Sequence, residues 1–244
     1  MLATTTSTYD SGLLEEIIPY FEEEHDAEVK ITAVGTGQAL ELGKRGDADV
    51  LLVHAPELEE EFVEDGYGRY RYDVMYNEFV VVGPEDDPAG LNGLTDTDEA
   101  FNRIYDNRST FSSRGDDSGT HIREMELWES AGFDYDNQID DPDSDWYNSL
   151  GQGMGDTLRF ADEKNSYTLT DEGTYISMHQ EIDDLEIHVR GDERLFNQYG
   201  VIPVDGARNP ELAEGFADWI ISEDVQNMID DYTIDGKKVF TANA

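Results

Sequence analysis

The sequence of 244 residues contains no cysteine, few prolines, and only 16 lysine plus arginine residues against 57 acidic ones. The absence of cysteine excludes disulfide and thiolate chemistry. No run of about 18 apolar residues occurs, and no basic start leads into an apolar stretch with a cleavage site. The sequence therefore predicts a soluble chain, a mature form whose targeting segment has been removed.

The scarcity of positive charge leaves a formal net charge of −41. A small domain usually carries a charge of about 2 to 8, so nucleic acid and anionic membranes are poor partners for this surface. Disorder is excluded because 38% of the residues are hydrophobic and 11% aromatic. At molar salt the Debye length is about 3 Å, and such a shell no longer repels itself. The composition predicts a protein of an extreme halophile; an acidic surface without salt adaptation is the alternative.

Hydrophobic periodicity predicts helices alternating with strands. The helices are expected over 13–21, 38–45, 122–128, 156–164, 172–179, 210–221 and 224–232. The strands are expected over 29–34, 50–53, 79–82, 185–189 and 201–204. Asp10 or Ser11 is expected to cap the first helix, and residues 4–8 to form the loop before it. This order is typical of an α/β protein with mixed sheets flanked by helices.

Four segments place hydroxyl or glycine residues directly before an expected helix: TTTS at 4–7, GTG at 35–37, SRGDDSGT at 113–120 and GQGMG at 151–155. The first turn of a helix carries unpaired N–H groups and a partial positive charge, and small side chains leave both accessible. Helix capping alone explains any one of these segments. Four of them, one with an arginine, predict a convergent anion site.

Arg114 offers a planar fork of permanent donors that suits an oxyanion, or it pairs with Asp116 or Asp117 beside it. A fully deprotonated tetrahedral dianion only accepts hydrogen bonds, so its site should exclude carboxylates, whereas a protonated phosphate suits one acceptor. We expect Asp116 and Asp117 to face away, which leaves a patch of hydroxyls and amides around Arg114.

Several segments resemble the tungstate-binding solute receptors of ABC transporters, which belong with molybdate and sulfate receptors to the type II extracellular solute-binding proteins. They are TTTSTYDSGLL (4–14), AVGTGQALELGKRGDADVLLVHAP (33–56), VMYNEFVVVGPEDDPAG (74–90), SRGDDSGTH (113–121), WYNSLGQGMGDTL (146–158) and YTLTDEGTY (167–175). The similarity runs from about residue 4 to the C-terminus, and the pairing of TTTS with SRGDxSGTH is its most specific part. Glu172 departs from the family pattern, which often has a basic residue there.

The resemblance implies two α/β lobes of the type II periplasmic-binding-protein fold, with the oxyanion held in a cleft between them. Lobe 1 would comprise residues 1–82 and 201–244 and lobe 2 residues 83–200, with crossings near 83–90 and 190–203. The ligand-binding residues that it implies, matched motif by motif, are Thr6, Ser7, Thr36, Ser113, Arg114, Ser118 and Gly119, with Met154 and Gly155 as an extension through their backbone amides.

The resemblance also implies a function without catalysis, cofactor or resident metal. The chain would capture tungstate outside the cell with high affinity, close its lobes around the dianion and deliver it to a membrane permease. It would act as a monomer, held at the outer face of the cell membrane by a lipid anchor on the absent leader. Molybdate is nearly the same size and charge as tungstate, and sulfate and phosphate are further alternative ligands.

Two alternatives come from other classes. A serine hydrolase would use Ser118, His121 and an acid such as Asp117, although no GxSxG elbow is present. A metal site would use His121 with Glu124, or the acidic segment 134–145, which lacks the glycine and glutamate of a calcium loop and is better explained as a solvated loop. The acidic segment 57–61 is likewise expected to be solvated, and the remaining histidines, His54 included, to occupy ordinary structural or surface positions.

Overall fold

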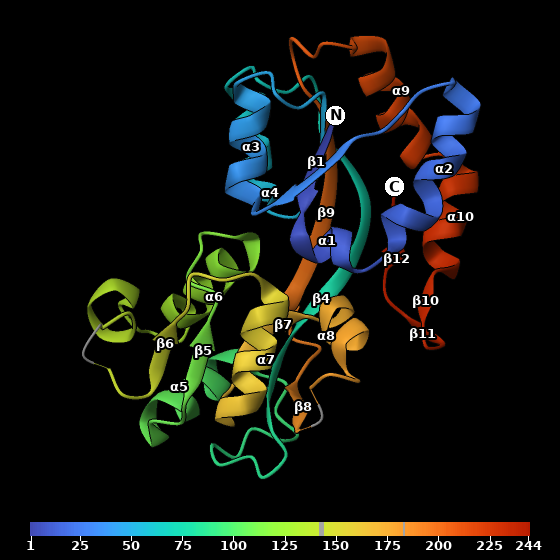
Figure 1. Ribbon diagram of the computed structural model, residues 1–244. Coiled ribbons are helices and arrows are strands. Elements are labelled where there is room, and N and C mark those ends of the chain that lie inside the picture. The colour runs from blue at the N-terminus through green and yellow to red at the C-terminus, as the bar shows by residue number, and fades with distance from the viewer. Residues whose placement is uncertain (142–143, 183) are drawn as a thin grey trace. The chain divides into compact units, whose positions relative to one another are not determined.

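The computed structural model describes residues 1–141, 144–182 and 184–244, which form two compact units (Figure 1). Unit 1 combines Met1–Asn77 with Asn197–Ala244, and unit 2 is Glu78–Phe196. These boundaries precede those expected at 82/83 and 200/201. The reason is that β4 (Tyr72–Pro84) is one long strand that pairs within both units, so the turn-rich segment after it lies inside unit 2.

Unit 1 is built on a mixed sheet in the order β12-β4-β9-β3-β1-β2. Strands β2 and β3 are parallel to β1, whereas β9 is antiparallel to β3 and β12 is antiparallel to β4. Besides β4, the strands are β1 (Leu2–Thr5), β2 (Ile31–Val34), β3 (Val50–Val53), β9 (Phe196–Pro203) and β12 (Thr241–Ala242), and a hairpin pairs β10 (Thr233–Ile234) with β11 (Lys237–Lys238). The predicted α/β class is confirmed.

Helices cover both faces of this sheet (Figure 1). Leu2 and Leu52 point to the core that α2, α9 and α10 cover, while Ala3 and Leu51 point to the core under α3 and α4. Apolar residues on both faces are typical of strands buried between two helical layers. The helices are α1 (Thr6–Asp10), α2 (Leu13–His25), α3 (Thr36–Lys44), α4 (Pro56–Glu64), α9 (Pro210–Ile220) and α10 (Glu223–Asp231).

Three expectations about unit 1 are wrong. Residues 4–7 are no loop, because β1 continues to Thr5 and α1 begins at Thr6. The N-cap of α2 is Gly12, although the Ser11 hydroxyl does accept the Leu13 N–H. The expectation of a solvated segment 57–61 is wrong for Glu59, which is fully buried in α4 and pairs with the Arg71 guanidinium at 2.7 Å, whereas Glu57, Glu60 and Glu61 are exposed as expected.

Unit 2 contains the second half of β4, which pairs antiparallel with β7 (Thr168–Asp171) and β8 (Leu185–Val189). Strand β5 (Phe111–Ser113) runs parallel to β6 (Tyr147–Ser149). Side chains of β4 alternate here as well, with Phe79 and Val81 in one core and Val80 and Val82 in the other. The helices are α5 (Thr97–Asn107), α6 (Gly119–Ser130), α7 (Met154–Lys164), α8 (Glu172–Met178), a π-helical turn η1 (Tyr135–Ile139) and a 3₁₀ turn η2 (Glu193–Leu195).

The buried face of α6 is not the one that its apolar residues Ile122, Met125 and Trp128 would form. Ile122 and Met125 are only partly buried, whereas His121 and Glu124 lie inside with Leu127 and Trp128. These polar side chains can occupy the buried face because His121 bonds to the Tyr135 hydroxyl and Glu124 to the Tyr147 hydroxyl, and hydrophobic periodicity does not register such bonds. The segment 134–145 forms η1 in its first part, and residues 142–143 of the predicted solvated loop lie outside the described residues.

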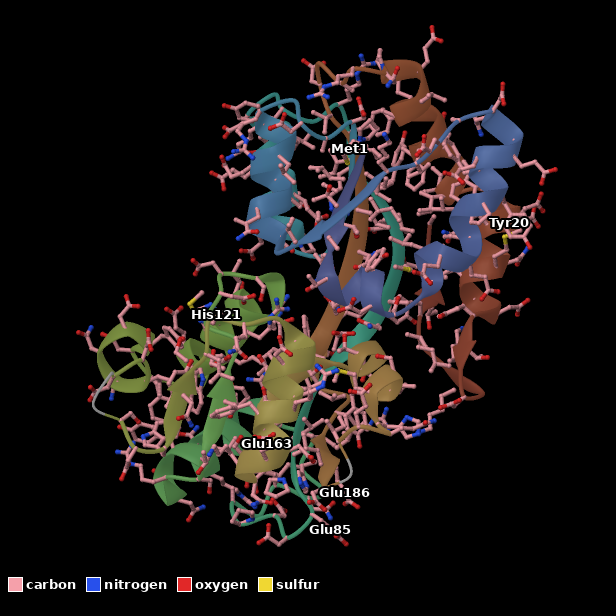
Figure 2. All side chains as sticks on the ribbon, viewed as in Figure 1. Met1, Tyr20, Glu85, His121, Glu163 and Glu186 are labelled. Carbon is pink, nitrogen blue, oxygen red and sulfur yellow. The ribbon has the colours of Figure 1, made fainter. Side chains whose placement is uncertain are left out.

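Acidic side chains project from the surface of both units (Figure 2). Glu85, Glu163 and Glu186 are exposed on the outside of unit 2. Within residues 1–141, 144–182 and 184–244, every helix is too short or too polar to cross a bilayer.

Candidate anion site

Two of the expected binding segments in unit 1 follow neighbouring strands. Strands β1 and β2 are parallel, with Thr5 beside Val34 at their carboxyl ends. Helix α1 begins at Thr6 and α3 at Thr36, directly after these ends. Loops at the carboxyl ends of parallel strands are where open α/β sheets bind their ligands. The parallel register thus brings TTTS and GTG together within unit 1.

Both segments present hydroxyl donors that this unit leaves unused. The buried Oγ1 atoms of Thr6 and Thr36 have no hydrogen-bond partner among the described residues. Gly35, the N-cap of α3, contributes no side-chain cap. The Ser7 hydroxyl lies 3.2 Å from the hydroxyl of Thr5 and 3.5 Å from Nε2 of His54. Because a buried hydroxyl without a partner is costly, these donors are expected to serve a ligand.

In unit 2 the expected segments also follow parallel strands. Ser113 of β5 pairs with Ser149 of β6, and Arg114 is the next residue. The Gln152 N–H donates to the carbonyl of Arg114 at 3.0 Å, which binds the GQGMG segment to the Arg114 backbone. Gly115 has a φ of +57°, and a Cβ there would meet the Ser149 hydroxyl at 2.1 Å, so only glycine fits this crossing. The loops before α6 and α7 are thereby joined.

Arg114 is buried, with 4% of its surface exposed. Its Nη2 donates to Oδ2 of Asp116 at 2.6 Å, and Oδ1 of Asp116 accepts the Ser118 N–H at 3.2 Å. The Nε atom of Arg114 has no partner within the described part of the chain. The expectation that both aspartates face away is therefore wrong for Asp116, because its carboxylate bridges the guanidinium and a backbone amide. The Asp117 side chain is 95% exposed and does point to solvent.

A second carboxylate acts on Arg114. Asp171 is fully buried at the end of β7, where it caps α8 by accepting the Thr174 N–H at 2.9 Å and its hydroxyl at 2.6 Å. Burial raises the pKa of Asp171, while the Thr174 bonds and the charge of Arg114 oppose that rise. The sequence analysis did not name Asp171 among the site residues. Its proximity to Arg114 follows from the strand arrangement and has no local signal.

The start of α6 adds a donor that the sequence analysis missed. Thr120 is almost fully buried, and its Oγ1 has no partner among the residues the structure describes. Thr120 belongs to the SRGDDSGT segment. Its hydroxyl follows Ser118 and Gly119 directly, and this position was the signal that could have marked it as a binding residue. The Ser118 hydroxyl accepts the His121 N–H at 3.3 Å, which leaves its own hydrogen free to donate.

Helix α7 begins with the weaker candidates. Met154 is buried and Gly153, the N-cap, contributes no side-chain cap to the first turn. A Cβ on Gly155 would lie 3.3 Å from the Met178 sulfur, so the glycine permits close packing there. A role for their amides toward an anion stays a prediction, because no unpartnered side-chain atom among the described residues marks this segment.

The Ser113 hydroxyl is directed into unit 2. It accepts the Gly115 N–H at 3.2 Å, and its proximity favours the ionised form of the Glu124 carboxyl. Glu124 accepts from the Tyr147 hydroxyl at 2.7 Å and from the Trp128 indole at 3.2 Å. Burial raises the pKa of Glu124 to about 7, although these bonds favour its ionised form. The Ser113 hydroxyl thus has an internal donor in Gly115.

The geometry of Ser118 and His121 opposes the hydrolase alternative. Nδ1 of His121 accepts the Asp117 N–H at 3.1 Å, and its Nε2 lies 2.9 Å from the Tyr135 hydroxyl. Both ring nitrogens are thus engaged, and neither bonds to the Ser118 hydroxyl, as a general base would. Burial lowers the pKa of His121, against the opposing charges of Asp117 and Asp116. Within the described residues, no cluster of histidines and carboxylates is arranged to hold a metal ion.

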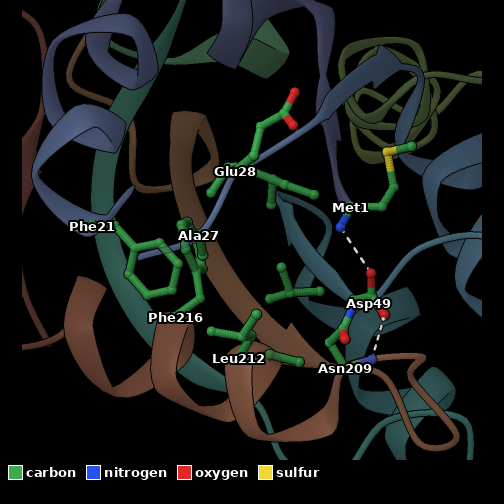
Figure 3. A pocket seen from close by; sticks show the side chains of 12 residues that line it. Met1, Phe21, Ala27, Glu28, Asp49, Asn209, Leu212 and Phe216 are labelled. Atoms are coloured by element: carbon green, nitrogen blue, oxygen red, sulfur yellow. Dashed lines mark hydrogen bonds and ion pairs between the residues drawn. The ribbon is translucent and has the colours of Figure 1, made fainter. Parts of the chain in front are cut away.

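A pocket in unit 1 lies at the amino ends of the strands, opposite the ends that carry the binding segments (Figure 3). It is lined by Leu2 and Val50, near the amino ends of β1 and β3, and by apolar side chains of α2 and α9. Its polar groups include the Glu28 side chain and the Asp49 carboxylate, which accepts from the Met1 amino group at 2.8 Å and from the Asn209 N–H at 3.1 Å. An apolar wall with a carboxylate does not suit an anion.

Comparison with known proteins identifies relatives over the full length. The model of the PBP superfamily domain matches residues 1–224. The tungstate-binding protein TupA of Peptoclostridium acidaminophilum is 48% identical, with 100% of this chain and 85% of that protein covered. The structure of TupA from Desulfovibrio alaskensis G20 is 44% identical, with a TM-score of 0.82 and coverage of 100% and 98%. The structure of the tungstate ABC transporter protein from Geobacter sulfurreducens is 46% identical, with a TM-score of 0.83 and coverage of 95% and 97%.

Proposed function

Because this chain belongs to the PBP superfamily and, within it, to the family of the TupA proteins, we propose that it is the tungstate-binding receptor of an ABC transporter. It binds the dianion outside the cell and passes it to a membrane permease, and it catalyses no reaction. We further propose that it acts as a monomer, anchored by lipid at the cell surface. Its relatives have the type II receptor fold, and we propose that this chain binds its ligand with the same fold.

One observation carries the proposal: four buried donors that have no partner among the described residues lie in segments that follow the carboxyl ends of parallel strands. They are the hydroxyls of Thr6 and Thr36 in unit 1 and of Thr120 in unit 2, together with Nε of Arg114. A tetrahedral dianion offers only acceptors and would satisfy all of them. We propose that the donors of both units act on the same anion, with Ser7, Ser118 and the amides of Gly119, Met154 and Gly155 completing the set.

The carboxylate of Asp116 makes phosphate a second candidate ligand beside tungstate. A protonated phosphate carries a hydrogen that an acceptor beside Arg114 could receive, whereas tungstate has none at neutral pH. Because the guanidinium already neutralises Asp116, we propose that the carboxylate orients Arg114 and that tungstate is preferred. Molybdate, of similar size and charge, is the ligand that is hardest to discriminate from it.

Thermal unfolding in concentrated KCl, with tungstate, molybdate, sulfate or phosphate added separately, tests this function. A ligand that binds only the native state raises the melting temperature by mass action. We expect the largest increase with tungstate, a comparable one with molybdate and small ones with sulfate and phosphate. An unchanged melting temperature with all four anions would contradict the proposal. The same series in dilute KCl tests the proposed salt adaptation, for which we expect a lower melting temperature.

A further inference from the structure

His121 lies in the first turn of α6, directly after the SRGDDSGT segment (Figure 2). The residue is buried, its Nδ1 accepts the Asp117 N–H at 3.1 Å, and its Nε2 lies 2.9 Å from the Tyr135 hydroxyl. A backbone N–H can only donate, so Nδ1 carries no hydrogen and the neutral ring holds its single hydrogen on Nε2. His121 is therefore a donor toward Tyr135 and an acceptor toward the loop before α6.

A buried chain of hydroxyls imposes the same arrangement from the other side. Oε1 of Glu124 accepts the Trp128 indole N–H at 3.2 Å and the Tyr147 hydroxyl at 2.7 Å. Because Tyr147 gives its hydrogen to Glu124, its oxygen is the acceptor in the 2.7 Å contact with the Tyr135 hydroxyl. The Tyr135 oxygen in turn has a lone pair for the Nε2–H of His121. These bonds all point from His121 toward Glu124, and they favour the tautomer whose Nδ1 accepts.

The Asp117 amide controls the backbone beside the proposed ligand residues. It belongs to the peptide bond that follows Asp116, and Asp117 itself has a φ of +55°, which is uncommon outside glycine. In this turn the Asp116 carboxylate reaches back to Nη2 of Arg114 at 2.6 Å and to the Ser118 N–H at 3.2 Å. The bond to His121 thus fixes the peptide plane on which the direction of Asp116, and with it that of Arg114, depends.

We propose that His121 is a positioning residue for the anion: its Nδ1 holds the Asp117 amide and so keeps Arg114 and the start of α6 directed at the ligand. A hydrogen on Nδ1 would face the hydrogen of the Asp117 amide, so the ring performs this role only in the neutral form with hydrogen on Nε2. Burial lowers the pKa of His121 and favours that neutral form. The inference rests on the proposed function, because it assigns a role toward the same ligand.

Nitrogen-15 NMR of the histidine rings in the ligand-free wild type identifies the tautomer. We expect Nε2 of His121 to carry the hydrogen, and Nδ1 to have the chemical shift of a bare nitrogen that accepts a hydrogen bond. Tungstate should leave this tautomer unchanged, since the ring exchanges no proton with the ligand. A hydrogen on Nδ1 would overturn the proposal. This measurement needs no variant, so it applies even where a substitution prevents folding.

Two amide substitutions separate the two ring nitrogens. His121→Asn places its Oδ1 where Nδ1 lies and can still accept the Asp117 N–H, whereas His121→Gln reaches Tyr135 and leaves that N–H without this acceptor. Both variants keep the backbone N–H that donates to the Ser118 hydroxyl. In calorimetric titration with tungstate, we expect the Kd of His121→Asn to stay within about twofold of the wild type. That of His121→Gln should be about 5- to 10-fold higher, the equivalent of one lost hydrogen bond.

His188→Gln is the matched control, because His188 is also buried in unit 2 but its Nε2 lies 3.0 Å from the carbonyl of Pro84, outside the binding segments. It should leave the Kd unchanged even if it lowers the melting temperature. Equal Kd values for the wild type and His121→Gln would overturn the proposal, and so would an equal loss of affinity in His121→Asn and His121→Gln. Failure of the wild type to bind tungstate would instead remove the proposed function, while the ligand-free tautomer would still be measured.

Discussion

Replacement of Thr36 by valine should change stability and binding in opposite directions. The side chain is fully buried and its Oγ1 has no partner within the described residues, so the folded chain bears the cost of an unpaired hydroxyl. Valine has nearly the same shape without that group, so we expect the ligand-free variant to gain about 1 kcal/mol. For a chain of this size that gain raises the melting temperature by about 2–4 °C.

Binding should suffer because the same hydroxyl is a proposed donor to a charged ligand. A hydrogen bond to a charged group contributes about 1.5–3 kcal/mol, which corresponds to roughly a 10- to 150-fold increase in Kd. Melting without ligand and calorimetric titration with tungstate measure the two effects.

Thr4→Val is the matched control for this experiment. Thr4 is as buried as Thr36 and lies in the same unit, but its hydroxyl donates to the carbonyl of Leu52 at 2.7 Å. Its loss should lower the melting temperature and leave the affinity unchanged. A Thr36→Val protein that melts lower than the wild type, or that binds tungstate equally well, would refute the reasoning.

Two further outcomes are expected. Arg114→Ala should weaken tungstate binding by about 2–5 kcal/mol, because it removes a buried guanidinium that we place beside the dianion. Replacement of the exposed Arg159 by alanine should leave the affinity measured by calorimetry unchanged. An unaltered Kd in a folded Arg114→Ala protein would exclude Arg114 from the site. Glu124→Gln should alter stability with pH: the folded pKa of about 7 lies above the ordinary value of 4.5, so the wild type loses stability as pH rises through this interval. The variant should be stabilised relative to the wild type by about 3 kcal/mol more at pH 8 than at pH 5 in denaturant titrations, and parallel pH profiles of the two proteins would contradict this account.

Local sequence patterns were sufficient for much of the fold. The run 50–53 and the segment 185–189 form strands at the predicted positions. These features depend on a few neighbouring residues, since apolar runs and capping groups act within one element. The strand at Leu2–Thr5 escaped notice because its threonines resemble a loop, although it occupies the middle of the parallel strands of unit 1.

The candidate site was predictable only in outline. Arg114, Thr6 and Thr36 were marked by motifs that combine donors with helix starts, and each has an unpartnered donor atom. By contrast, Asp116 was expected to face away, yet its carboxylate bonds to the Arg114 guanidinium. Which way such a side chain turns depends on partners that are distant in the sequence, and no local pattern encodes them.

The sequence by itself determined the α/β class, the acidic surface and the four segments rich in hydroxyls and glycines. These properties follow from composition and from the short-range preferences of helices and strands. Only the tertiary structure decided that Thr120 is an unpaired donor, that Asp171 lies near Arg114 and that His121 joins the Asp117 amide to Tyr135. The physical reason is strand pairing: parallel register brings the ends of separate strands to one edge, and there burial and hydrogen bonding assign each polar group its role.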